Sequence, residues 1–218
     1  AAIDDETAGV LVEPIQGEGG INVPSKDFMQ GLRKLCTEKN ILLACDEVWT
    51  GPARTGRWFA HQHFDIQPDV MTLAKAIGGG MPLGACVAAH KYADVLGAGT
   101  HGCTMGGMPV CAAAGVATMK LIADENLVER AAERGKKVIQ AIRDAKIPCV
   151  KEVRGAGFFL GIQVDKPARE VFLAALEAGL FICPAREHVV RLAPPLTIRE
   201  GDSERALSAI AAALRDIA

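Results

Sequence analysis

The feature that most limits the possible folds is a set of three short apolar runs that end at polar residues. They are "GVLVEP" at 9–14, "ILLACD" at 41–46 and "VMTLA" at 70–74. Continuous apolar runs of this length are typical of parallel strands buried on both faces. Between the first two runs, Ser25 can cap a helix that ends near residue 40. We therefore expect an α/β fold with a mainly parallel sheet and flanking helices.

The composition of the sequence changes near residue 126, where charged residues become frequent. We expect the following elements beyond this point: a helix at 127–145, a strand at 158–164, a helix at 168–178, short strands near 180–183 and 189–192, and a closing helix opened by Asp202 or Ser203. The pattern predicts two domains, with residues 1–124 in part of a large domain and residues 125–218 in a smaller α/β domain.

Composition excludes several classes of protein. The net charge of the 218 residues is -2, so the chain offers no basic surface for nucleic acid. No apolar run reaches the length of about 18 residues that a membrane span needs. The seven cysteines are odd in number and contain no CxxC pair, which favours free thiols in a reducing compartment and no metal site. We therefore expect a cytoplasmic protein.

Lys75 is the only charged residue after Asp69 in "DVMTLAKAIGGGMPLGACVAA", residues 69–89. A lysine is rarely fully buried unless it is paired or chemically used. Asp46 ends the preceding apolar run, and ligands of open α/β sheets bind where strands end. Spacing alone favours a buried Asp46–Lys75 ion pair. The alternative is a Schiff-base lysine with an acid that holds the pyridine nitrogen of pyridoxal phosphate (PLP).

Two glycine-rich segments bear on the choice between an ion pair and a PLP-binding lysine. Gly78, Gly79 and Gly80 follow the lysine and allow a bulky ligand to approach the backbone, although a plain turn needs the same residues. In "THGCTMGGMP" (100–109), Thr104 stands just before a predicted helix. A hydroxyl and backbone N–H groups at such a place suit a phosphate, and an ordinary helix terminus explains them equally well.

Four segments together resemble the class III, fold-type-I PLP-dependent aminotransferases, and most closely the acetylornithine and ornithine aminotransferases. The segments are "VEPIQGEGG", "DEVWTGPARTGRWFAHQHFDIQPDVMTLAKAIGGGMPLGA", "HGCTMGGMP" and "VVRLAPPLTI". The resemblance covers essentially the whole chain. It implies the fold-type-I architecture, with part of the large PLP-binding domain followed by the small C-terminal domain. Because family members are about twice as long, it also implies that the chain begins inside the large domain.

The resemblance implies a role for each matching residue. Lys75 would bind PLP as a Schiff base, Asp46 would pair with the pyridinium nitrogen, and Val48 would pack on the ring. Thr104 would reach the cofactor phosphate of the neighbouring subunit, because family sites lie at the interface of a homodimer. Glu13 and Glu18 would line the substrate site.

Glu18 would also be able to pair with Arg191 of "VVRLAPP". An arginine can hold the carboxylate of glutamate or 2-oxoglutarate with two hydrogen bonds. When the substrate presents no carboxylate there, Glu18 can neutralise the arginine instead. We expect this pair to act as a switch between the two half-reactions, and the alternative for Glu18 is a solvated loop acid.

The sequence departs from the family at three positions and lacks three features that the family's N-terminal half supplies. Trp49 stands where most relatives have glutamine, Met108 where asparagine is usual, and Cys103 where serine or threonine is usual. The family's N-terminal half supplies a glycine- and serine-rich phosphate loop, an aromatic residue on the ring and an arginine for the distal carboxylate. None of these has a counterpart in the 218 residues.

Two functions follow as alternatives. The first is PLP-dependent transamination of an ω-amino acid, with N-acetylornithine as donor and 2-oxoglutarate as acceptor in arginine biosynthesis. Ornithine, succinylornithine and 4-aminobutyrate stay open as donors. The second is a non-catalytic aminotransferase fragment or paralogue that acts as a structural or dimerisation module. Trp49 and the missing segment favour the second function, and the presence of Lys75, Asp46, Glu18, Thr104 and Arg191 favours the first.

Overall fold

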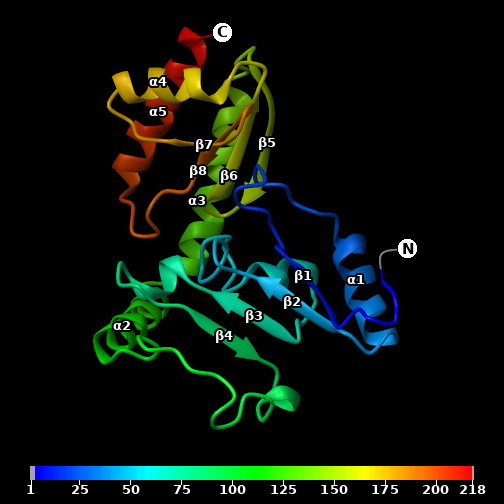
Figure 1. Cartoon of the computed structure of the whole chain (residues 1–218). Helices are drawn as coiled ribbons and strands as arrows, with labels where there is room; N and C mark the ends of the chain where they lie inside the picture. The colour runs from blue at the N-terminus through cyan, green and yellow to red at the C-terminus, as the bar shows by residue number, and fades with distance from the viewer. Residues whose placement is uncertain (1–2, 218) are drawn as a thin grey trace. The chain divides into compact units, whose positions relative to one another are not determined.

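The computed structural model of the protein describes residues 3–217, which form two compact units (Figure 1). Unit 1 contains the residues up to Pro14, Pro24–Pro52 and Phe59–Glu125. Unit 2 contains Ile15–Val23, Ala53–Trp58 and the residues from Asn126 onward.

Unit 1 contains a four-stranded sheet in the order β1-β2-β3-β4. The strands are β1 (Gly9–Val12), β2 (Leu42–Asp46), β3 (Val70–Leu73) and β4 (Ala85–Ala88). The first three are parallel, and β4 is antiparallel to β3. In the register of the sheet, Cys45 lies between Val12 and Met71. The mainly parallel α/β sheet expected from the apolar runs is therefore present, with strands one or two residues shorter than expected.

The first helix of unit 1, α1 (Lys26–Glu38), begins where the sequence predicted. The Ser25 hydroxyl accepts a hydrogen bond from the Phe28 N–H at 3.1 Å and so caps the helix. The helix contacts β2 and buries Met29 and Cys36. Phe28 and Leu35 are exposed, so only part of the apolar side chains of α1 is buried.

The remaining helices of unit 1 follow the sheet strands. They are the 3₁₀ segments η1 (Ala60–Phe64), η2 (Lys75–Gly78) and η3 (His90–Tyr92), and the helix α2 (Pro109–Asp124). Proline suits the first position of α2 because its missing N–H has no intrahelical partner there. Met108 occupies the N-cap position and provides no side-chain hydrogen bond to the helix.

Asp69 ties several elements of unit 1 together at the start of β3. Its buried carboxylate accepts a hydrogen bond from the Leu43 N–H at 2.9 Å and ion-pairs with Arg33 at 2.6 Å and Lys91 at 2.9 Å. Burial alone would raise the pKa of Asp69, but the N–H and the two cations outweigh it and lower the pKa to about 2. The carboxylate therefore stabilises the fold in its charged form.

Unit 2 contains a second four-stranded sheet, antiparallel and in the order β5-β6-β8-β7. Its elements are α3 (Leu127–Asp144), β5 (Val150–Ala156), β6 (Phe159–Val164), α4 (Ala168–Glu177), β7 (Cys183–Arg186), β8 (Val189–Leu192) and α5 (Glu200–Asp216). Helix α3 contacts β5 and β6, and α4 contacts β7, β8 and α5 (Figure 1). The apolar core between sheet and helices includes Val153, Leu160, Ile162, Val171, Val190, Ile210 and Leu214.

Two expected boundaries in unit 2 were wrong. The short strand expected near 180–183 is β7, which begins at Cys183. The closing helix begins at Glu200 after the N-cap Arg199, and neither Asp202 nor Ser203 caps it. The Ser203 hydroxyl instead donates to the Arg199 carbonyl at 3.2 Å from inside the first turn. Glu200 and Asp202 lie in the first turn of α5, where acids complement the helix dipole.

The segment Ala53–Trp58 packs into unit 2 against glycines. The Phe158 N–H donates to the Arg54 carbonyl at 2.8 Å. A Cβ atom added to Gly157 would lie 2.4 Å from the Thr55 carbonyl carbon, and one added to Gly135 of α3 would lie 2.0 Å from the Gly157 oxygen. No side chain fits at either position, so the two glycines allow α3, the β5–β6 turn and this segment to meet.

None of the helices formed by residues 3–217 is long and apolar enough to cross a membrane.

Candidate functional site

The carboxyl ends of the three parallel strands of unit 1 bring together three predicted site residues. Asp46 is the last residue of β2 and lies level with Thr72 of β3. Glu13 directly follows β1, and Lys75 lies two residues beyond the end of β3. The same edge of the sheet therefore carries two carboxylates and one amine, at the place where open α/β sheets bind their ligands.

Lys75 is exposed and Asp46 is half-buried, so the expectation that the two form a buried ion pair was wrong. It is the first residue of η2, just after the strand, and it has a positive φ of 48°. Its Nζ lies 4.2 Å from the centroid of the Trp49 ring. This is a cation–π contact, and it shows where the large indole that replaces the family's glutamine lies. The position of Lys75 at the sheet edge, not its burial, makes it a candidate.

Asp46 is half-buried and oriented by its own loop. The Val48 N–H donates to Asp46 Oδ1 at 2.9 Å, in the manner of an Asx turn. Val48 is also half-buried, two residues from the carboxylate. The loop thus holds the Asp46 carboxylate at the end of β2, and the packing of Val48 on a cofactor ring stays a prediction.

Glu47 is a residue whose importance the sequence analysis missed. Its side chain is fully buried, and its carboxylate accepts hydrogen bonds from the N–H groups of Ala60 and His61, both at 2.8 Å. The Nδ1 atom of His61 lies 3.0 Å from the same carboxylate, and the Thr50 hydroxyl donates to it as well. Glu47 therefore fixes the loop that carries Asp46 and Trp49. Two consecutive acids after an apolar strand were the available signal, because one of them must point inward.

The glycines that follow Lys75 have different structural roles. Gly79 has a φ of 58°, and a Cβ atom on it would lie 2.3 Å from the Thr118 hydroxyl of α2. Gly79 therefore serves the turn and the close approach of η2 to α2, as the plain-turn interpretation requires. Gly80 has a φ of 103°, and an added Cβ atom would meet no heavy atom within 4 Å. Of the three glycines that follow Lys75, only Gly80 borders open space.

Thr104 lies exposed in the loop between η3 and α2. The loop is rich in glycine, and Gly107 has a φ of 68°. The hydroxyl is thus accessible near the start of α2. Its contact with a phosphate of the neighbouring subunit stays a prediction.

Glu18 and Arg191 form the pair that the sequence analysis expected, and both belong to unit 2. Arg191 lies in β8 with only 8% of its surface exposed, and its Nη1 atom is 2.7 Å from Glu18 Oε1. Glu18 is exposed in the loop Ile15–Val23. The arginine is therefore largely withdrawn from water, while the acid that neutralises it sits on an accessible loop. The role of the pair in binding substrate stays a prediction.

The groups at the sheet edge of unit 1 suit PLP chemically. A primary amine at Lys75 can form a covalent bond to a carbonyl carbon. The Asp46 carboxylate, held by the Val48 N–H, can pair with a protonated ring nitrogen. The open space at Gly80 leaves the backbone accessible to a ring or a phosphate. The residues present therefore fit the cofactor that the resemblance implies.

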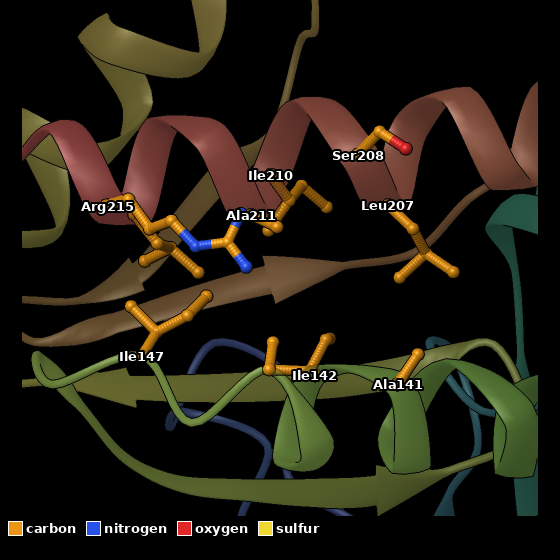
Figure 2. Close-up of a pocket in the computed structure, with 10 residues that line it drawn as sticks. Ala141, Ile142, Ile147, Leu207, Ser208, Ile210, Ala211 and Arg215 are labelled. Atoms are coloured by element: carbon orange, nitrogen blue, oxygen red, sulfur yellow. The ribbon is translucent and has the colours of Figure 1, made fainter.

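A groove in unit 2 differs from this site in its lining. Figure 2 shows the groove between α3 and α5, with a volume of about 320 Å³. Its walls are mainly apolar and include Ile142, Ile147, Leu207 and Ile210, with Arg215 across it. None of the predicted site residues lines it. The groove lacks the converging polar groups that a catalytic pocket needs.

Comparisons with known proteins agree with this arrangement. The family model "aminotransferase class-III" matches residues 1–214. Acetylornithine aminotransferase from Mycolicibacterium smegmatis is 48% identical over 215 residues, which cover 98% of this chain and 55% of that protein. Acetylornithine aminotransferase 1 from Bordetella pertussis is 47% identical over 204 residues, which cover 93% of this chain and 52% of that protein. The chain spans about half the length of these relatives.

Solved structures show the same similarity in three dimensions. Ornithine aminotransferase from Toxoplasma gondii, solved with partial occupancy of PLP at its active site, superposes with a TM-score of 0.90 at 36% identity. The match covers 95% of this chain and 51% of that one. Acetylornithine aminotransferase from Elizabethkingia anophelis gives a TM-score of 0.88 at 39% identity, covering 94% and 56%.

Proposed function

The chain belongs to the class-III aminotransferase family, and on this premise we propose that it takes part in PLP-dependent transamination. The observation that carries the proposal is the placement of Asp46 and Lys75 at the carboxyl ends of the adjacent parallel strands β2 and β3. A sheet edge of this kind is where α/β enzymes bind ligands. The amine and the carboxylate there are the two groups that a PLP enzyme requires from its protein.

Each residue has a task that its position supports. When bound, PLP supplies an electron sink for the carbon atom that loses a proton. Lys75 would hold the cofactor through Nζ and move a proton at the substrate carbon. Asp46, oriented by the Val48 N–H, would keep a proton on the ring nitrogen. Val48 would pack against the ring, and Thr104 would bind the phosphate of the partner subunit in a homodimer.

The proposed donor is an ω-amino acid, with N-acetylornithine first and 2-oxoglutarate as acceptor, as in arginine biosynthesis. The names of the relatives support this choice, and so does the Glu18–Arg191 pair. Arg191 would hold the acceptor carboxylate, and Glu18 would neutralise the arginine when the donor presents no carboxylate there. Glu13, at the end of β1, would line the substrate site. Ornithine, succinylornithine and 4-aminobutyrate are the other donors to be tested.

The remaining parts of the proposal concern organisation. We propose that residues 1–124 belong to the large PLP-binding domain of fold type I and residues 125–218 to its small C-terminal domain. The mainly parallel sheet before residue 124 and the antiparallel sheet after it support this division, whereas the segments Ile15–Val23 and Ala53–Trp58 belong to unit 2. A cytoplasmic location is proposed from the cysteines, of which Cys36, Cys45 and Cys149 are buried and free.

The test is covalent labelling of Lys75. The chain is mixed with PLP, its visible absorption is recorded, and the product is reduced with borohydride and mapped by mass spectrometry. We expect the cofactor on Lys75 and no visible band in Lys75→Ala. Lys34→Ala is the matched control, because Lys34 is an exposed lysine on α1 that faces Glu38. Label at other lysines with Lys75 unmodified would show that the assignment is wrong.

A second candidate function is a non-catalytic structural or dimerisation module. It is favoured by the contact of Trp49 with Lys75 Nζ, which places a bulky ring against the amine that must react. Exposed apolar side chains on α2, including Val110, Val116 and Leu121, also suit an interface. Absence of the PLP adduct, together with concentration-dependent association of the chain, would favour this function.

A further inference from the structure

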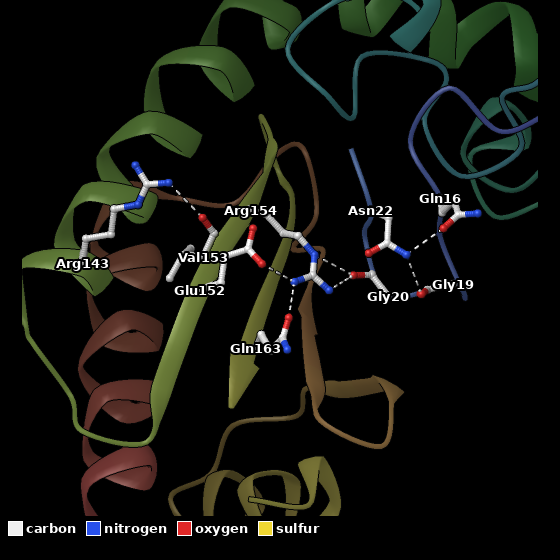
Figure 3. A network of polar contacts seen from close by, with 9 residues as sticks. All are labelled: Gln16, Gly19, Gly20, Asn22, Arg143, Glu152, Val153, Arg154 and Gln163. Carbon is white, nitrogen blue, oxygen red and sulfur yellow. Dashed lines mark hydrogen bonds and ion pairs between the residues drawn. The ribbon is translucent and has the colours of Figure 1, made fainter. Parts of the chain in front are cut away.

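The loop that carries Glu18 closes on itself at its base. The Gln16 N–H donates to the Asn22 carbonyl at 3.0 Å. The Asn22 amide donates to Gln16 Oε1 at 2.7 Å and to the Gly19 carbonyl at 3.0 Å (Figure 3). Inside this neck, the Gly20 N–H donates to the Gly17 carbonyl at 3.2 Å. The loop is therefore a compact turn with Glu18 at its exposed tip.

Arg154 of β5 holds this loop to the sheet. Its Nε and Nη2 atoms both donate to the Gly20 carbonyl, at 3.1 and 2.8 Å (Figure 3). The guanidinium is itself fixed from the other side by Gln163 Oε1 at 2.6 Å and Glu152 Oε2 at 2.8 Å. Its side chain is 15% exposed. A rigid fork in this environment fixes the carbonyl more firmly than a single flexible donor does.

The next residue of the loop, Ile21, is in a strained conformation. It has a φ of 55° and is fully buried, although a β-branched residue rarely adopts positive φ. It packs over Gly161, where an added Cβ atom would lie 3.0 Å from Ile21 Cβ. Gly161 of β6 is paired with Arg191 of β8. Strain of this kind persists only where the surroundings determine the conformation, and here they hold the loop beside the arginine.

We propose that Arg154 is a positioning residue that sets how firmly Glu18 neutralises Arg191, and thereby how readily Arg191 accepts a substrate carboxylate. The inference rests on the proposed function, because it assumes that Arg191 receives that carboxylate. Glu18 and the substrate compete for one guanidinium. A loop that is held in place gives Glu18 a high effective concentration at Arg191, and a loosened loop lowers it.

The inference predicts opposite effects on the affinity for two kinds of ligand, those that present a carboxylate to Arg191 and those that do not. Loosening the loop frees Arg191, so a carboxylate should bind more tightly. A donor that presents no carboxylate there should bind less tightly, because the buried arginine is then left without its neutralising acid. A purely structural role of Arg154 would weaken both ligands together.

The experiment measures the binding of glutarate to the full chain by calorimetry and, with PLP, the KM values for N-acetylornithine and 2-oxoglutarate. Arg154→Lys keeps the positive charge and loses the two guanidinium donors that hold the Gly20 carbonyl. We expect it to tighten glutarate about three- to tenfold, to lower the KM for 2-oxoglutarate and to raise the KM for N-acetylornithine. Asn22→Ala opens the neck at an exposed residue and should act in the same direction even if the Arg154 variant folds poorly. Arg143→Lys is the control, because Arg143 donates to the Val153 carbonyl of the same strand at 2.9 Å (Figure 3).

Combining Arg154→Lys with Glu18→Gln shows whether Arg154 acts on glutarate binding through Glu18 or in another way. Glu18→Gln should itself tighten glutarate, and Arg154→Lys should add nothing to it. An equal shift in both backgrounds, no shift in either loop variant, or no glutarate binding even with Glu18→Gln would overturn the inference. Failure of the proposed function is distinguishable, since it removes transamination and the label on Lys75 while the glutarate measurements still report on Arg191.

Discussion

Replacing Asp69 by asparagine tests how the start of β3 is held. The carboxylate accepts a hydrogen bond from the Leu43 N–H and forms ion pairs with Arg33 and Lys91. These contacts outweigh the effect of burial and lower the pKa of Asp69 from 3.8 to about 2. This difference corresponds to about 2 kcal/mol of folding free energy. Because the folded-state pKa is the lower one, the stabilisation is complete above the unfolded value of 3.8 and is lost as the pH falls toward about 2. Asp69→Asn should therefore reduce stability by about 2 kcal/mol at neutral pH.

The assay is urea unfolding of the wild type and the variant at neutral pH and at about pH 2.5, below the unfolded pKa. We expect the gap in unfolding free energy between the two proteins to shrink strongly at the lower pH. Asp65→Asn is the control, because Asp65 pairs with Lys26 at the surface, where ion pairs contribute little. A gap for Asp69→Asn that is the same at both pH values would refute the reasoning.

Two further predictions concern packing and thiol reactivity. Gly135→Ala should lower the melting temperature of the protein, because its Cβ would lie 2.0 Å from a carbonyl oxygen, whereas Gly31→Ala in α1 meets no atom within 4 Å and should raise it slightly through helix propensity. Equal melting temperatures for the two variants would contradict this. Burial, with the nearby charge of Glu47, raises the pKa of Cys45 to about 12. Iodoacetamide should therefore label the exposed Cys86 in the native protein and leave Cys45 unmodified until denaturant is added, as mass spectrometry of the digested protein can show.

Local patterns were sufficient for most of the secondary structure. The apolar runs became β1, β2 and β3. The expected burial on both faces was wrong: β1 lies at the edge of the sheet with Leu11 exposed, and buried and half-buried residues alternate along β2 and β3. Ser25 capped α1 as predicted, since a cap depends on residues three positions apart. The start of α5 was misplaced because Asp202 and Ser203 suit a cap and a first turn equally well. Only the path of the chain before Glu200 distinguishes the two positions.

The family, the candidate residues and the expectation that Glu18 pairs with Arg191 followed from the resemblance, which depends on residue types in a recognisable order. Only the tertiary structure decided which residues are exposed or buried and which residues far apart in the sequence are in contact. It exposed Lys75 beside Trp49, buried Glu47 in the loop after β2, and fixed the Glu18 loop through Arg154, which is 134 residues from its partner Gly20. Contacts between residues so far apart leave no local periodicity, so they depend on how the strands are arranged and paired.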